Sequence, residues 1–156
     1  MIWDKLSDTD WKKAAPYVDT LLVPVIDINM SDKASFSEQH RHSLDIAIKI
    51  ERQLAERVML MPPVSYVADD VWLQPYVTNI RQQGEAAGFS RLFFLIEEAL
   101  LERVNTVDWG DYLKVSIIED TDEQIRNLCE QIVHEWRKDG CDSRSDEWAG
   151  RDSNPR

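Results

Sequence analysis

Short hydrophobic runs alternate along the chain with segments that have helical periodicity. The runs at residues 20–26, 58–61, 91–96 and 112–118 are rich in strand-forming residues, and each predicts a strand. The first run is continuously apolar, as is typical of a strand buried on both faces of a sheet. Pro24 lies inside this run and has no amide hydrogen to donate, so we expect a bulge or an unpaired position there.

Capping signals place helices between these strands. Ser35 and Glu38 have the spacing of a capping box, which predicts a helix over about residues 36–56. A second helix is expected before the third strand. Pro75 suits its first turn, where the missing amide costs nothing, and Gly88 suits its C-terminal cap.

The last helix has the clearest periodicity. Asp120 and Glu123 suit its start, and apolar side chains then recur on one face with a period of 3.6 residues. The members of this face are Ile125, Leu128, Cys129, Ile132, Val133 and Trp136. Because Cys129 belongs to it, we expect a buried free thiol. Two shorter segments, 7–15 and 97–104, also favour helix.

The alternation of strands and helices predicts an α/β fold in a single domain. We expect a three-layer sandwich around a mostly parallel sheet of about four strands, spanning residues 1–138. From Asp139 onward the chain has almost no apolar residues. Such a segment does not bury enough surface to offset the entropy of ordering, so residues 139–156 are predicted to form a polar, flexible tail.

Charge excludes some classes of function. The chain carries 29 acidic and 18 basic residues, a formal net charge of −11, which argues against nucleic-acid binding. It has no apolar run of about 18 residues, so no membrane span is expected. The N-terminus lacks a signal-peptide pattern, which predicts a cytoplasmic protein. Residues 97–123 are the most acidic. They form either a solvated face or a surface for a basic protein, and Trp148 in the tail is a second candidate for docking.

Several catalytic and cofactor motifs are absent. The chain has no glycine-rich nucleotide loop, no Gly-x-Ser-x-Gly and no Cys-x-x-Cys. His40 and His42 are two residues apart, and on the predicted helix they diverge by roughly 200°, which is poor geometry for one metal ion. We therefore predict no bound metal and no cofactor.

Polar residues at the ends of the predicted strands are the candidate site. Ligand sites in α/β folds lie beyond the carboxyl ends of the strands. Paired carboxylates there either bind a hard cation, act as general acid and base, or form a solvated acidic face. The pocket candidates are Asp27, Asn29, Asp45, Ser65, Tyr66, Glu97 and Glu98.

The chain resembles the YpiF-like family of small bacterial proteins. The resemblance rests on Trp3 and Trp11, residues 17–25 (YVDTLLVPV), residues 50–54 (IERQL) and residues 57–66 (RVMLMPPVSY), and it covers roughly residues 1–138. It implies a bacterial, cytoplasmic protein and brings no assigned reaction.

A second resemblance, in layout alone, is to creatininase-type metal-dependent amidohydrolases. Residues 23–25 (VPV), Asp45 and residues 61–63 (MPP) fit that frame. The metal ligands do not fit, because Asn29 and Ser31 occupy the places of the family's Glu and His. Neither side chain supplies the carboxylate or imidazole that activates a bound water. The layout therefore implies a relative without the family's chemistry.

These observations favour a non-enzymatic accessory or protein-interaction module. Two alternatives stay open. One is a degenerate or unusual amidohydrolase-like enzyme that uses the strand-end carboxylates. The other is a small-ligand binding module that uses the same crevice without chemistry, which an apolar pocket carrying Tyr66 and Trp72 would favour.

Overall fold

The structure is a computed structural model that describes residues 2, 7–28, 36–66 and 70–152, and within them all side chains but those of 36–40, 66, 70 and 140–152. The helices are α1 (Asp8–Ala14), α2 (Phe36–Gln53), α3 (Asp70–Ala86), α4 (Glu98–Arg103) and α5 (Thr121–Asp152). The strands are β1 (Thr20–Asp27), β2 (Val58–Leu60), β3 (Val64–Tyr66), β4 (Arg91–Glu97) and β5 (Tyr112–Val115).

The strands form one parallel sheet in the order β2-β1-β4-β5, and β3 also pairs with β1. The first half of β1 pairs with β2 and its last residues pair with β3. Pro62 and Pro63 lie between these two short strands, so β2 and β3 act as the two halves of one interrupted edge strand. The expected α/β fold with a mostly parallel sheet is confirmed.

The position of Pro24 is explained by that interruption. Its Cα pairs with Leu95 of β4 on one side. On the other side, β2 pairs with β1 as far as Leu22, and the pairing of β1 with β3 begins at Val25, so Pro24 has no partner on that side. The expectation of an unpaired position is confirmed, because a residue without an amide hydrogen loses nothing at a gap in the ladder.

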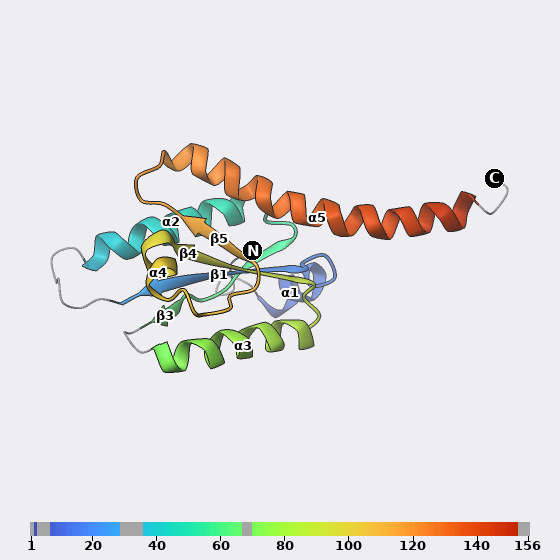
Figure 1. The fold of residues 1–156 in the computed structure, drawn as a ribbon. Coiled ribbons are helices and arrows are strands. Elements are labelled where there is room, and N and C mark those ends of the chain that lie inside the picture. Colours follow the sequence, from blue (N-terminus) through green and yellow to red (C-terminus); the bar gives the residue numbers. More distant parts are fainter. Residues whose placement is uncertain (1, 3–6, 29–35, 67–69, 153–156) are drawn as a thin grey trace.

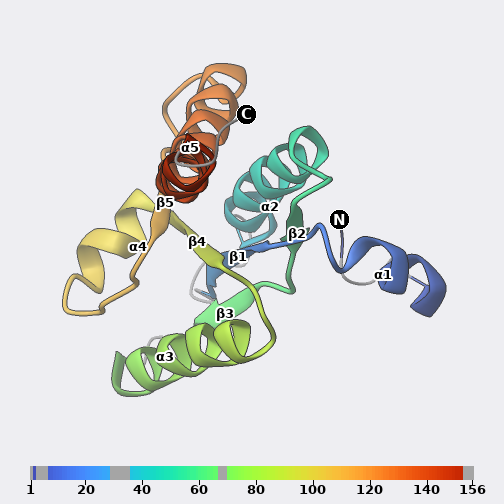
Figure 2. The same ribbon diagram turned by 90° about the vertical axis from the view of Figure 1, so that its right-hand side faces the viewer.

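Helices cover both faces of the sheet (Figures 1 and 2). The helices α2 and α5 pack on one face, around a core that includes Leu22, Ile50 and Ile132. Side chains from α1, α3 and α4 join the core on the other face, which includes Val23, Val77 and Leu100. The result is the predicted three-layer arrangement, with β1 and β4 in the middle.

Several predicted helix ends are confirmed. The Ser7 side chain accepts a hydrogen bond from the backbone N–H of Asp10 at the start of α1. Asp120 accepts one from the N–H of Glu123 at the start of α5. Gly88 has a φ of 97°, the left-handed conformation expected of a C-terminal cap. The proposed capping box of Ser35 and Glu38 involves side chains outside the described residues.

Two predicted element ends are wrong. The fourth strand was expected to reach residue 118 but ends at Val115, and Ile117 and Ile118 are exposed. The helix expected before the third strand also begins earlier than predicted, because α3 starts at Asp70 and Pro75 lies inside it rather than in its first turn. The helix predicted over about residues 36–56 is confirmed as α2, which ends at Gln53. At α5 the helix continues to Asp152 and projects beyond the sheet (Figure 1), so the predicted boundary at residue 139 falls within a helix. The flexibility of residues 139–156 stays a prediction.

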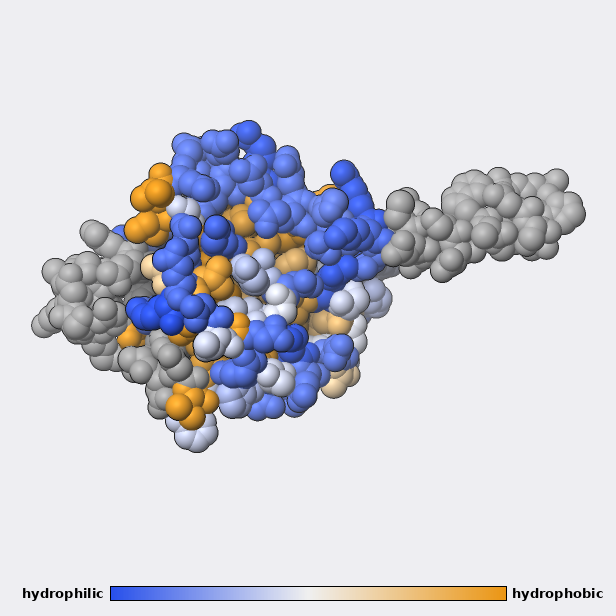
Figure 3. All heavy atoms as spheres, in the orientation of Figure 1, coloured by the Kyte–Doolittle hydropathy of each residue, from blue (hydrophilic) through white to orange (hydrophobic). Residues whose placement is uncertain are grey.

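Polar contacts attach α5 to the amino-terminal edge of the sheet. The indole N–H of Trp136 donates to the Thr20 hydroxyl at 2.8 Å, and the Arg57 guanidinium lies 4.0 Å from the centre of the Trp136 ring. Arg91 at the start of β4 forms an ion pair with Asp139 at 2.6 Å. The hydrogen bonds that Arg91 donates to the Asp139 carboxylate raise the pKa of Arg91 above its usual value, so this guanidinium stays charged. The described part of α5 otherwise presents a mostly hydrophilic surface (Figure 3).

Candidate functional site

Three of the predicted site residues lie at the carboxyl-terminal ends of the parallel strands, where a ligand site is expected. The strand order reverses between β1 and β4, and in open α/β sheets the crevice beyond such a reversal is the usual ligand site. Asp27 ends β1, Glu97 ends β4, and Glu98 begins α4. The sequence therefore predicted correctly that these strand ends share one edge.

Each of these carboxylates has a partner within the protein. Asp27 forms an ion pair with Arg103 of α4, and Glu98 lies 3.6 Å from the ammonium group of Lys114. Glu97 accepts a hydrogen bond of 2.9 Å from the hydroxyl of Ser43, a buried residue of α2. These contacts link the strand ends to neighbouring elements of the fold, and they give each carboxylate a partner.

The other predicted site residues do not join this cluster in the described structure. Asp45 is exposed on α2, because it lies about 200° around the helix axis from Ser43. Ser65 of β3 pairs with Ile26, so its backbone lies at the same edge of the sheet, but its side chain is exposed. Asn29 and the side chain of Tyr66 lie outside the described residues. Among the residues that are described, no group of three His, Cys, Asp or Glu side chains is placed to hold a metal ion.

Sequence reasoning missed the roles of Ser43 and His42. His42 is half-buried, and its Nε2 lies 3.3 Å from the carbonyl oxygen of Ser116 at the end of β5. A serine among apolar positions of an amphipathic helix is the one signal that pointed to Ser43, because a buried hydroxyl needs a partner. The partner itself, 54 residues along the chain, follows only from the fold.

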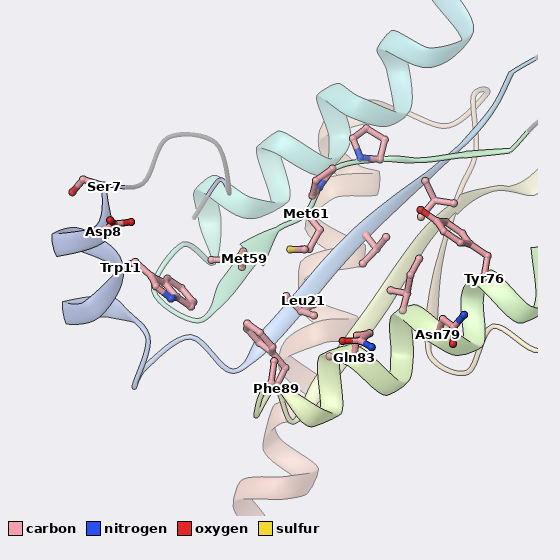
Figure 4. Close-up of a pocket in the computed structure, with 17 residues that line it drawn as sticks. Ser7, Asp8, Trp11, Leu21, Met59, Met61, Tyr76, Asn79, Gln83 and Phe89 are labelled. Carbon is pink, nitrogen blue, oxygen red and sulfur yellow. The ribbon is translucent and has the colours of Figure 1, made fainter.

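A different site, an apolar groove, lies on the face of the sheet that carries α1 and α3. It has a volume of about 830 Å³. Its floor is made by buried side chains of β1, β2 and β3: Leu21, Val23, Met59 and Val64. Trp11 of α1 stands on one side, and Tyr76, Asn79 and Gln83 of α3 stand on the other (Figure 4).

The two helices beside the groove differ in length. The seven residues of α1 span about 10 Å, whereas the 17 residues of α3 span about 25 Å. At one end α3 packs closely on β1, because Gly84 has no side chain, and a Cβ there would lie only 3.1 Å from Leu21 Cδ1.

The lining of the groove is mostly hydrophobic and carries little charge. Among the described residues that line it, Asp8 is the one charged side chain and no basic residue is present. The amides of Asn79 and Gln83 and the hydroxyl of Tyr76 can donate and accept hydrogen bonds. Met59 and Met61 have unbranched, flexible side chains, so the lining of the groove can adapt to ligands of different shapes. Asp27, Asp45, Ser65, Glu97 and Glu98 do not line it.

The sheet order and the helices on both of its faces make this a doubly wound α/β protein. Residues 9–136 match the model of a family described as "Protein of unknown function (DUF2487)", and the chain belongs to that family. Over 68 residues it is 32% identical to the uncharacterized protein YpiF of Bacillus subtilis (strain 168). That segment covers 43% of this chain and 46% of the relative, so less than half of the relative's length is matched. No solved structure gives a significant match.

These findings confirm the resemblance to YpiF-like proteins and leave the resemblance to amidohydrolases as a prediction. None of the helices within residues 7–28, 36–66 and 70–152 combines the length and the hydrophobicity that a membrane span requires.

Proposed function

We propose that this protein is a non-catalytic binding module that holds an uncharged, hydrophobic small molecule in the groove between α1 and α3. The groove itself carries the proposal. Its volume of about 830 Å³ falls within the usual range of small-molecule sites, roughly 300–1,000 Å³. Such sites combine an apolar lining with a few polar groups, and the amides on α3 supply those groups here.

The charge of the lining defines the class of ligand. A carboxylate or phosphate would need a cation or a set of aligned donors, and the described lining offers no Lys, Arg or His. The carboxylate of Asp8 would repel an anion further. A neutral aromatic or aliphatic molecule with one or two hydrogen-bonding groups fits, because Asn79 and Gln83 can satisfy those groups without placing an unpaired charge in the groove.

The alternative of an enzyme at the strand ends has less support. Asp27 and Glu98 are paired with cations, and Glu97 accepts a hydrogen bond from Ser43. A general acid or base must come within hydrogen-bond reach of its substrate, and none of these three carboxylates lines the groove between α1 and α3. An accessory role that uses the acidic segment 97–123 or the tail for another protein is compatible with ligand binding. We also propose a cytoplasmic location, on the basis of the resemblance to YpiF-like proteins.

The proposal is tested with two dyes that share an aromatic core. N-phenyl-1-naphthylamine is uncharged, and 8-anilinonaphthalene-1-sulfonate carries a sulfonate. Their fluorescence is titrated against the full chain. We expect the neutral dye to bind at least tenfold more tightly than the anionic one. Equal binding of the two dyes would contradict the proposed role of charge, and no binding of either would contradict the site.

Two neighbouring glutamines of α3 provide a matched pair of variants. Gln83 lines the groove and Gln82 does not, and both side chains are exposed. Gln83→Trp places an indole in the opening and should weaken binding of the neutral dye at least tenfold. Gln82→Trp makes the same change outside the groove and should alter binding less than twofold. Equal effects of the two substitutions would mean that the dye binds elsewhere.

A further inference from the structure

A second groove lies on the opposite face of the sheet, along the surface between α2 and α5. It consists of two hollows with volumes of about 410 and 890 Å³. Both are lined by Gln53 of α2 and Arg126 of α5, so they adjoin. Asp122 lines one end and Arg137 the other, a separation of 15 residues on α5. In a helix that corresponds to about 22 Å.

The rims of this groove are basic, although the chain is strongly acidic. Lys49 and Arg52 line it from α2, and Arg126 and Arg137 line it from α5. All four side chains are exposed. Two acidic residues, Asp122 and Glu130, also line it, as does His134. The lining therefore has a local excess of positive charge within a chain whose formal net charge is −11.

The four basic side chains are not engaged by acids of the described structure. Each of the ion pairs found there involves other residues. Arg57 and Arg91, by contrast, pair with acids and hold α5 to the sheet. The basic rims thus have no evident structural role within the described residues, and their charge is available to a ligand.

Between the rims lie four apolar side chains, alongside the polar Gln53, Asn127 and Gln131. The apolar ones are Leu54, which directly follows α2, and Ile125, Cys129 and Val133 of α5. Ile125 and Cys129 are 3% and 7% exposed, and Leu54 and Val133 are half-buried. An apolar floor with charged rims is the pattern of a groove that receives an amphipathic helix, whose apolar face meets the floor while its charged flanks meet the rims.

We propose that the groove between α2 and α5 binds an acidic amphipathic helix of another protein. A partner helix of about 15 residues matches the length of the groove. Its glutamates or aspartates would pair with Lys49, Arg52, Arg126 and Arg137, and its apolar residues would cover Leu54 and Val133. Charge complementarity of this kind mainly sets the rate of encounter and the choice of partner. This proposal is independent of the small-molecule site on the other face.

The observations favour a protein segment over nucleic acid. A polyanion extends beyond a groove of about 22 Å and meets the rest of the surface, where the net charge of −11 repels it. A short acidic helix stays within the basic strip. A free inorganic anion would use the charges alone and would leave the apolar floor exposed to water.

A designed peptide tests the proposal. The probe is a fluorescein-labelled 15-residue helix with leucines on one face and glutamates on both flanks, and binding to the full chain is followed by fluorescence anisotropy. We expect saturable binding that weakens at least tenfold when the salt concentration rises from about 50 to 300 mM. The same peptide with lysine in place of glutamate should not bind. Equal binding of the lysine peptide would overturn the proposal.

Two double variants separate a local effect from a change in overall charge. Arg52→Glu with Arg126→Glu reverses both rims and should weaken peptide binding at least tenfold. Lys12→Glu with Lys13→Glu makes the same charge change on α1, where both side chains are exposed, and should weaken binding less than threefold. Equal losses would overturn the proposed site. Circular dichroism checks that both variants are folded.

Competition identifies the class of ligand. Displacement of the peptide by a 15-nucleotide single strand or by inorganic phosphate, at concentrations similar to that of an unlabelled acidic peptide, would overturn the proposal in favour of a general anion site. Sedimentation of the chain alone addresses a second copy as the occupant. Dimerisation that the Arg52→Glu, Arg126→Glu variant abolishes would overturn the assignment to a different protein. A monomer that binds the peptide supports it.

Discussion

Gln124 offers a direct test of how the open edge of the sheet is stabilised. Its side-chain oxygen accepts a hydrogen bond from the backbone N–H of Ser116 at 2.6 Å, and its amide group donates to the Ser116 carbonyl at 2.8 Å. Both residues are buried. One side chain therefore supplies the donor and the acceptor that a neighbouring strand would otherwise provide, just beyond the end of β5.

Gln124→Met keeps the length of the side chain and removes both hydrogen bonds. Each bond contributes about 1 kcal/mol. The Ser116 N–H left without a partner adds a further cost, whereas the Ser116 carbonyl keeps its contact with His42, so we expect a loss of about 3 kcal/mol in the free energy of unfolding. For a chain of this size that corresponds to a fall in Tm of about 9 °C. Urea and thermal unfolding followed by circular dichroism at 222 nm measure both quantities.

Gln131→Met is the matched control, because Gln131 is an exposed residue of the same helix. It should change the free energy of unfolding by less than about 0.5 kcal/mol.

Gln124→Glu tests the same contact with Ser116 through the dependence of stability on pH. The carboxylate that it introduces accepts from the Ser116 N–H but repels the Ser116 carbonyl, whereas its protonated form can donate again. The loss should therefore be larger at pH 8 than at pH 5. A Gln124→Met variant as stable as the control would refute the reasoning.

Three further predictions concern the core beneath α5. Ile132→Ala removes a side chain with 0% exposure and should cost about 2–5 kcal/mol in urea unfolding; a cost below about 1 kcal/mol would contradict the packing. Trp136→Phe removes the indole N–H that donates to the Thr20 hydroxyl. A double-mutant cycle with Thr20→Val should give a coupling energy of about 1 kcal/mol. Zero coupling would argue against this hydrogen bond. Burial raises the pKa of the Cys129 thiol from 9.0 to about 11, so its thiolate fraction at pH 8 is about 90-fold lower than that of a free thiol. In a Cys141→Ala variant, iodoacetamide should therefore react with Cys129 correspondingly slowly. A reaction rate like that of a free thiol would contradict the burial.

The layers of the fold could be predicted from local pattern, because a strand buried on both faces leaves a continuous apolar run. The end of β5 shows where that reasoning fails. The run continues through Ile117 and Ile118, yet these side chains are 70% and 88% exposed. The ladder stops where the side chain of Gln124 takes the hydrogen bonds of Ser116. That contact depends on the position of α5, which the apolar run does not encode.

The candidate site was predictable only in part. The strand ends could be placed on one edge, since parallel strands end together. The partners of their carboxylates were not predictable, because Arg103 lies 76 residues from Asp27, and Ser43 lies 54 residues from Glu97. The groove between α1 and α3 left no motif at all. Its lining comes from α1, α3 and three strands, which are spread along the chain, so no local pattern of residues marks it.

The interrupted edge formed by β2 and β3 has a consequence for association between chains. A long, regular edge strand offers its unpaired amides and carbonyls to strands of other molecules and so promotes aggregation. Here each half of the edge is three residues long, and Pro62 and Pro63 between them supply no amide hydrogen. Ile2 already pairs with Leu60 on the outer side of β2. An intruding strand would therefore find too few consecutive hydrogen bonds to stay in place, so this border of the sheet resists the growth of fibrils.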